Sequence, residues 1–137
     1  MSFLLDTCVL SEVVRPEPDP RVLAWLNSER SCFLSSLTIG ELKKGIEALP
    51  EGTKKRRLLS WLEEKVVYEF TQRILAIDLD VALVWGQLQG ELQRKGIRLP
   101  VIDGLLAATA LSHRLTLVTR NTKDFAPANV PVINPWS

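Results

Sequence analysis

The chain has 137 residues, of which 46% are hydrophobic and 24% are charged, so it is long enough for one domain with a substantial core. Its net charge of +1 excludes a global basic field of the kind that holds proteins non-specifically on nucleic acid. No apolar stretch reaches the ~20 residues of a membrane span, and the N-terminus lacks the basic region of a signal peptide. We therefore expect a single domain, residues 1–137, in the cytoplasm and with reduced cysteines.

Short apolar segments alternate with helix-like segments along the whole chain. We expect buried strands at 3–5, 32–35, 74–77, 116–119 and 130–133. Helices are expected at 7–14, 21–28, 39–49, about 58–66, 78–95 and 101–113. This alternation predicts an α/β fold: a three-layer α/β/α sandwich around a central, mostly parallel sheet of four to five strands.

Acidic residues lie where these predicted elements meet. Asp6 follows the first apolar run, Asp103 opens an apolar helix, and Glu41 and Asp124 lie at or beside other helix starts. A parallel sheet gathers such junctions along one edge, so these distant carboxylates would share one crevice. Carboxylates that are crowded together repel, and a divalent metal ion is the usual reason that a protein tolerates them.

Each of these residues also has a purely structural interpretation. Acidic residues are favoured at helix N-caps and in first turns, where they complement unpaired backbone N–H groups and the helix dipole. On this interpretation Asp6 is an N-cap, Glu41 completes a capping box begun by Thr38, Asp103 occupies a first turn, and Asp124 or Asn121 flanks a turn.

Three observations favour the shared metal over separate caps. The helix that follows Asp103 is apolar or small nearly all round, so its carboxylate would be partly buried and would need a partner. No lysine or arginine adjoins Asp6 or Asp103 in the sequence. Gly45 and Ala48 lie one and two turns beyond Glu41 and leave room for a ligand beside its carboxylate.

The chemistry of such a site follows from what the chain contains. Oxygen ligands favour Mg²⁺ or Mn²⁺ over zinc, which prefers histidine and cysteine. His113 is the only histidine and is expected at a helix C-terminus, which excludes a histidine-based pair and a serine triad. No glycine-rich phosphate loop is present. What remains is hydrolysis of a phosphodiester by a metal-activated water.

Four segments resemble one known family: LLDTCVLSEVVRP, SSLTIGELKKGIEAL, DGLLAATALSHRLTLVTRNTKDF and VPVINPW. They are similar, in order and spacing, to PIN-domain endoribonuclease toxins of the VapC/FitB type, and the likeness covers essentially the whole chain. The resemblance implies a single PIN domain over residues 1–137 and a Mg²⁺-dependent ribonuclease, with Mn²⁺ as a possible substitute. It also implies a type II toxin–antitoxin system, a cognate VapB-like antitoxin, a homodimer and a larger complex with the antitoxin.

The resemblance assigns roles to individual positions. Asp6, Glu41 and Asp103 fall on the three core acidic residues, Thr7 and Ser11 on the polar positions after the first aspartate, and Thr119 on a hydroxyl near the metal. The fourth acidic position aligns with Asn121, where this chain departs from the family pattern. Asp124, three residues later, would supply the missing carboxylate. We therefore expect Asp6, Glu41, Asp103 and Asp124 to hold the metal, with Asn121 and Thr119 completing the catalytic site.

Basic residues suggest where the RNA would lie. Arg120 and Lys123 flank Asn121 and are expected to contact phosphate, with Lys43 as a further candidate. The run of basic residues at 54–57 is explained equally well as a solvated helix start. Trp25 and Trp61 are expected in the core; if they are partly exposed, they would suit an apolar groove for a partner's helix.

Two other functions are compatible with parts of this pattern. A haloacid-dehalogenase-like phosphatase would use Asp6 as a nucleophile, but that chemistry needs a second aspartate where this chain has Cys8. An inactive PIN-like domain could act only as a binding module. The presence of Asp6, Glu41 and Asp103 together argues against it.

Overall fold

The computed structural model describes residues 1–137 and is built around a five-stranded parallel sheet with the order β3-β2-β1-β4-β5. The strands are β1 (Ser2–Leu5), β2 (Ser31–Ser35), β3 (Ile74–Leu75), β4 (Thr116–Val118) and β5 (Val132–Ile133). The chain starts in the middle of the sheet, adds β2 and β3 on one side, and then returns to add β4 and β5 on the other. The strand order therefore reverses beside β1, where open parallel sheets place their ligand crevice.

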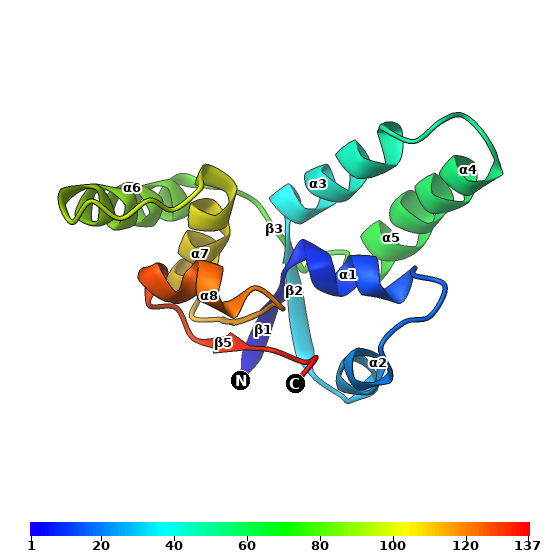
Figure 1. Ribbon diagram of the computed structural model, residues 1–137, viewed down its shortest axis with the longest axis horizontal. Helices are drawn as coiled ribbons and strands as arrows, with labels where there is room; N and C mark the ends of the chain where they lie inside the picture. Colours follow the sequence, from blue (N-terminus) through cyan, green and yellow to red (C-terminus); the bar gives the residue numbers. More distant parts are fainter.

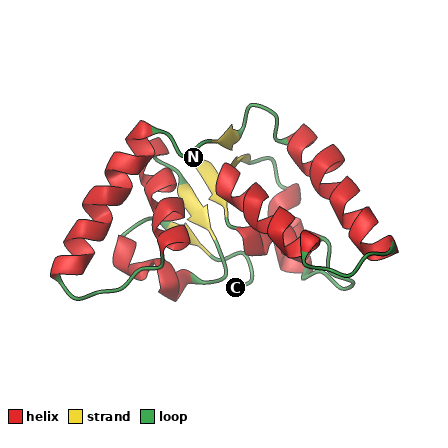
Figure 2. Cartoon of the chain, turned by 90° about the horizontal axis from the view of Figure 1, so that it is seen from above, coloured by secondary structure: helices red, strands yellow, loops and turns green.

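Helices cover both faces of the sheet, which confirms the expected three-layer α/β/α sandwich (Figure 1). One layer contains α1 (Thr7–Val13), α2 (Pro20–Asn27), α3 (Ser36–Glu47), α4 (Thr53–Ser60), the π-helical segment η1 (Trp61–Val66) and α5 (Val67–Glu69). The other contains α6 (Leu79–Arg94), α7 (Val101–His113), α8 (Thr122–Phe125) and the 3-10 turn η2 (Ala126–Ala128). Figure 2 shows these two groups of helices on either side of the strands.

The side chains of the central strand divide the core into two halves. Phe3 and Leu5 point into the core beneath α1, α2, α3 and η1, whereas Leu4 points into the core beneath α6 and α7. Leu4 and Leu5 are fully buried, and each such side chain contributes ~1.5–3 kcal/mol of hydrophobic stabilisation. This alternation fixes the register of β1 and therefore the position of Asp6 at its end.

The start of α3 differs from the expected one. The helix begins at Ser36, and the hydroxyl of Ser35 caps it by accepting the N–H of Leu37 at 3.1 Å. Thr38 is fully buried inside the helix, so the capping box from Thr38 to Glu41 is wrong. The sequence offers three candidate caps in this region, Ser35, Ser36 and Thr38, and the helix starts directly after β2 ends at Ser35. Glu41 lies in the second turn, with its side chain free for other contacts.

Most other boundaries agree with the sequence analysis. Asp78 caps α6 by accepting the N–H of Val81 at 3.0 Å, and α7 spans the expected residues after Pro100. The strand expected at 74–77 is limited to two residues. Within the basic run at 54–57, Lys55 is buried and pairs with Glu47 and Glu51, so this residue at least has a structural role. None of the helices combines the length and the apolar character needed to cross a bilayer.

Candidate active site

Asp6 stands at the carboxyl end of β1 and is the N-cap of α1, as its structural interpretation predicted. Its Oδ1 accepts the N–H of Thr7 at 2.7 Å, and its Oδ2 accepts the hydroxyl of Thr119 at 2.8 Å. Thr119 follows β4, which pairs with β1 so that Leu5 lies opposite Val118. Adjacent parallel strands thus end in two polar residues that meet inside the protein.

Glu41 reaches the same edge from α3. Its Oε1 accepts the hydroxyl of Thr7 at 2.6 Å, which joins the first turn of α1 to the second turn of α3. Asp103 approaches from the first turn of α7 and is half-buried. The α7 residues behind it are buried as expected, including Gly104, Leu106 and Ala107.

The pKa values of Asp6 and Asp103 reflect both burial and neighbouring carboxylates. Burial raises the pKa of Asp6, and the negative charge of Glu41 raises it further, against the lowering effect of its hydrogen bonds. The pKa of Asp103 is also raised, first by burial and then by the charges of Asp6, Asp124 and Glu41. The carboxylates of Asp6, Glu41 and Asp124 are thus near enough to Asp103 to act on its pKa, and their joint role as metal ligands stays a prediction.

No basic side chain neutralises this edge. The salt bridges of the protein hold other carboxylates, those of Glu12, Asp19, Glu47, Glu51 and Glu63. Glu12 illustrates the difference: it accepts the N–H of Asp19 at 2.8 Å and pairs with Arg15, and its pKa is lowered. The site carboxylates lack such a cation, so their repulsion is uncompensated by the protein itself.

The carboxylates do not form a tight ligand cluster in this structure. No group of three or more histidine, cysteine, aspartate or glutamate side chains converges as a metal-binding set. Like charges repel, and Thr7 and Thr119 hold two of the carboxylates in their present positions. The donors are nevertheless carboxylate oxygens without a salt-bridge partner, and the pKa values of Asp6 and Asp103 are raised, which is a set suited to a hard divalent cation.

Asn121 and Asp124 lie on the segment after β4. Asn121 is exposed at the start of α8, where its side chain makes no capping hydrogen bond, and its N–H donates to the Thr119 hydroxyl at 3.0 Å. Asp124 is exposed in the first turn of α8. The charge of Asp124 contributes to the raised pKa of Asp103.

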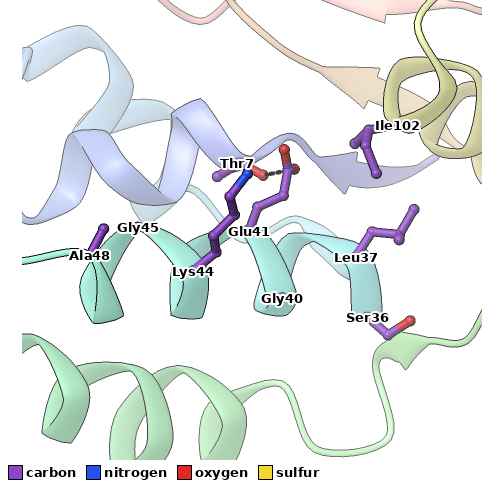
Figure 3. A pocket seen from close by; sticks show the side chains of 9 residues that line it. All are labelled: Thr7, Ser36, Leu37, Gly40, Glu41, Lys44, Gly45, Ala48 and Ile102. Atoms are coloured by element: carbon purple, nitrogen blue, oxygen red, sulfur yellow. Dashed lines mark hydrogen bonds between the residues drawn. The ribbon is translucent and has the colours of Figure 1, made fainter.

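A groove of about 640 Å³ opens beside Glu41, as the small residues of α3 predicted (Figure 3). Figure 3 shows Glu41 and Lys44 on the α3 side of this groove, together with Thr7 of α1. The remaining lining residues are Ser36, Leu37, Gly40, Gly45, Ala48 and Ile102. Ile102 directly precedes Asp103. The groove therefore adjoins the sheet edge where Asp6, Glu41, Asp103 and Asp124 lie, which we call the acidic edge, both at Glu41 and next to Asp103.

The basic residues considered for RNA contact differ in their surroundings. Lys43 pairs with Glu47 and Glu63, and Lys44 is the lysine that lines the groove. The guanidinium of Arg120 lies over the ring of Trp136 at 5.4 Å, whereas Lys123 is exposed and forms no salt bridge. The sequence contained the signal for Lys44: it lies three residues after Glu41, on the same helical face, and Lys43 does not.

Cys8 is a second residue that the sequence analysis did not place in the site. Its sulfur lies 3.7 Å from Oδ2 of Asp6 and 3.8 Å from the hydroxyl of Thr119. Burial raises the pKa of this thiol, and the charge of Asp6 contributes to the rise. Cys8 therefore packs as a neutral thiol against the first carboxylate. Both cysteines are free, as expected.

The fold and this edge define a class of protein: a parallel α/β/α domain whose strand ends gather carboxylates without matching cations. A family model described as PIN domain matches residues 3–129, and the chain belongs to this family. Toxin FitB of Neisseria gonorrhoeae is 42% identical over 136 residues, covering 98% of each chain. VapC ribonuclease Y4jK of Sinorhizobium fredii is 36% identical over 136 residues, covering 98% of this chain and 97% of the relative. The structure of FitAB bound to an IR36 DNA fragment contains a chain with a TM-score of 0.92 and 39% identity, covering 98% of this chain and 96% of that one.

Proposed function

We propose that this protein is the toxin of a type II toxin–antitoxin system and acts as a Mg²⁺-dependent endoribonuclease that hydrolyses RNA phosphodiester bonds. The observation that supports this most directly is the unneutralised acidic edge, where the charge of Glu41 raises the pKa of Asp6 and the charges of Asp6, Asp124 and Glu41 raise that of Asp103. The similarity to proteins named as a toxin and as a ribonuclease agrees with that chemistry.

The residues at the edge fit a hard cation. Asp6, Glu41, Asp103 and Asp124 would hold Mg²⁺, or Mn²⁺ in its place, and the amide oxygen of Asn121 would complete the set. When bound, the cation lowers the pKa of a coordinated water and offsets negative charge at the scissile phosphate. The chain's own hydroxyls do the positioning, because Thr119 holds Asp6 and Thr7 holds Glu41.

An apolar groove lies beside α1 and α2, lined by one of the two tryptophans considered for a partner's helix; Trp25 does not line it. It has a volume of about 360 Å³ and includes Trp61, which is half-buried. Its other apolar lining residues are Leu5, Leu10, Val13, Leu23, Leu26, Val66 and Phe70. A cognate VapB-like antitoxin would place the apolar face of a helix here. The homodimer, and its larger complex with the antitoxin, remain parts of the same proposal.

Growth and RNA integrity in a bacterial host test the proposal. Induced expression of the wild-type chain should arrest growth and produce defined new RNA ends. Asp6→Asn should do neither, although asparagine preserves the N-cap of α1. Co-expression of the small protein encoded beside this gene should restore growth. Arrest that persists with Asp6→Asn at equal expression would contradict the nuclease assignment.

A further inference from the structure

Gly40 lines the groove beside Glu41, at a position where packing does not require glycine. Gly40 lies inside α3 with a backbone that any residue can adopt, and a Cβ at this position would meet no atom within 4 Å. Glycine is a poor helix former compared with alanine. Gly104 shows the opposite case, because a Cβ there would lie 2.5 Å from the side-chain nitrogen of Gln89. Gly40 therefore leaves open space in the groove that it lines, and a larger side chain there would narrow the groove.

Lys44 places a free positive charge in the same groove. It is exposed, lines the groove with Glu41, and takes part in none of the salt bridges. The nearby lysines differ: Lys43 pairs with Glu47, and Lys55 pairs with Glu47 and Glu51. An unpaired cation one helical turn from a site carboxylate is suited to an anionic group of a substrate.

The other end of the groove is apolar. Leu37 and Ile102 line it, and Ile102 is 39% exposed and directly precedes Asp103. The groove thus combines an apolar surface, a free ammonium group and the carboxylate site within about 640 Å³, which is in the ~300–1,000 Å³ range of small-ligand sites. A nucleotide has the matching parts, since its base is flat and apolar on its faces and its phosphate is anionic.

We propose that Lys44 and the open space at Gly40 position the RNA strand for cleavage. Lys44 would contact a backbone phosphate, and a base would pack against Leu37 and Ile102. This inference rests on the proposed ribonuclease function and adds the residues that hold the substrate. Both residues are positioning residues that set RNA affinity.

Binding of RNA can be measured without cleavage in the Asp6→Asn background. Fluorescein-labelled single-stranded oligouridylate would be titrated at several NaCl concentrations and followed by anisotropy. Lys44→Gln should weaken binding and reduce the slope of log Kd against log salt by about 0.7, the value for one phosphate contact on a single strand. Arg114→Gln is the matched control, because Arg114 is an exposed, unpaired cation beside Leu115 at the amino end of β4, away from the site.

Gly40→Gln tests whether RNA binding needs the open space at Gly40, and Gly90→Gln is its control. Both glycines lie in helices where a Cβ meets nothing within 4 Å, and Gly90 is in α6. Both variants should melt at or above the temperature of the parent, because glutamine is the better helix former. Only Gly40→Gln should weaken oligouridylate binding. In the cleavage-competent chain, Lys44→Gln and Gly40→Gln should raise KM several-fold and change kcat little.

The outcomes separate this inference from the function on which it rests. If the wild type cleaves RNA and both groove variants bind and cleave like their controls, the groove does not hold the substrate. Unchanged RNA binding together with lost neutralisation by the co-expressed antitoxin would assign the groove to that partner and also overturn the inference. A wild type that cleaves no RNA contradicts the proposed function, whereas the binding comparison of Lys44→Gln with Arg114→Gln still decides whether the groove binds single strands.

Discussion

The hydroxyl of Thr119 donates a hydrogen bond to Oδ2 of Asp6 at 2.8 Å, although 113 residues separate them in the sequence. The pairing of β1 with β4 brings the two together, and the same hydroxyl accepts the N–H of Asn121 at 3.0 Å. Thr119 is fully buried. One buried hydroxyl therefore joins the first carboxylate of the site to the segment that contains Asn121 and Asp124.

Replacing Thr119 by valine should destabilise the protein and disturb Asp6. Valine keeps the shape but leaves the Asn121 N–H without its partner and Asp6 Oδ2 with only the long contact to the Cys8 sulfur, which costs ~1–3 kcal/mol. The pKa of Asp6 should rise further, because the Thr119 hydrogen bond lowers it. Thr119→Ser restores the hydroxyl and should recover most of the stability. Urea unfolding of the three proteins tests this; equal midpoints would mean that the bond contributes nothing.

Stability in EDTA should fall as pH rises, because the pKa values of Asp6 and Asp103 are raised in the folded state. Below their ordinary value of 3.8 these carboxyls are protonated in both the folded and unfolded chains, and the penalty is absent. As pH rises from 3.8 through the raised folded value, the folded chain binds more protons than the unfolded one and loses stability. The penalty then persists at neutral pH.

Asp103→Asn should therefore melt above the wild type in EDTA at pH 7.5. It should also lose most of the rise that Mg²⁺ gives the wild type, which is ~2.7 kcal/mol at a hundredfold excess over Kd. An Asp103 that only favours the helix dipole predicts the reverse: a small loss of stability in EDTA and an unchanged response to Mg²⁺. Thermal melts of both proteins, with and without Mg²⁺, distinguish the two roles without any RNA.

The segment after β4 should tune metal affinity. Asn121→Asp should tighten Mg²⁺ or Mn²⁺ binding, because it adds a charge to a site for a hard cation. Asp124→Asn should weaken both binding and cleavage, since the charge of Asp124 already acts on Asp103. Calorimetric titration checks both changes. Unchanged affinity in both variants would place the metal elsewhere.

The apolar groove beside α1 and α2 should be required for neutralisation. Val13 lines this groove and is 36% exposed, so Val13→Glu would bury an unpaired charge under the antitoxin helix. Val13→Glu expressed without the antitoxin should still arrest growth, but co-expression of the antitoxin should no longer restore growth. Val132→Glu, at a residue with the same exposure on β5, is the control. Equal rescue of both variants would remove the groove from the interface.

The sequence predicted the architecture well because each element contains its own local signal. Alternating apolar runs located the strands, and Asp78 and Pro100 marked the starts of α6 and α7. The acidic edge followed from the rule that parallel strands end on one side. The start of α3 was wrong because Ser35, Ser36 and Thr38 can all cap a helix, and only the end of β2 at Ser35 shows which of them does.

Contacts between distant segments could not be predicted in the same way. The bonds from Thr7 to Glu41 and from Thr119 to Asp6 depend on how α1, α3 and β4 meet, which no local pattern encodes. The placement of Cys8 against both Asp6 and Thr119 is of the same kind. Lys44 was available from helical spacing to Glu41, but the choice between Lys43 and Lys44 required knowing which one pairs with Glu47 and Glu63.

Cleavage of a defined RNA by purified protein, with and without Mg²⁺, tests the central claim most directly. Wild-type protein should cut the RNA in Mg²⁺, stop in EDTA and recover when Mg²⁺ or Mn²⁺ is restored. Asp103→Asn, folded by circular dichroism, should leave the RNA intact under all three conditions, because it removes a charged ligand from the acidic edge. Full cleavage by Asp103→Asn free of contaminating nuclease, or undiminished wild-type cleavage in EDTA, would contradict the account.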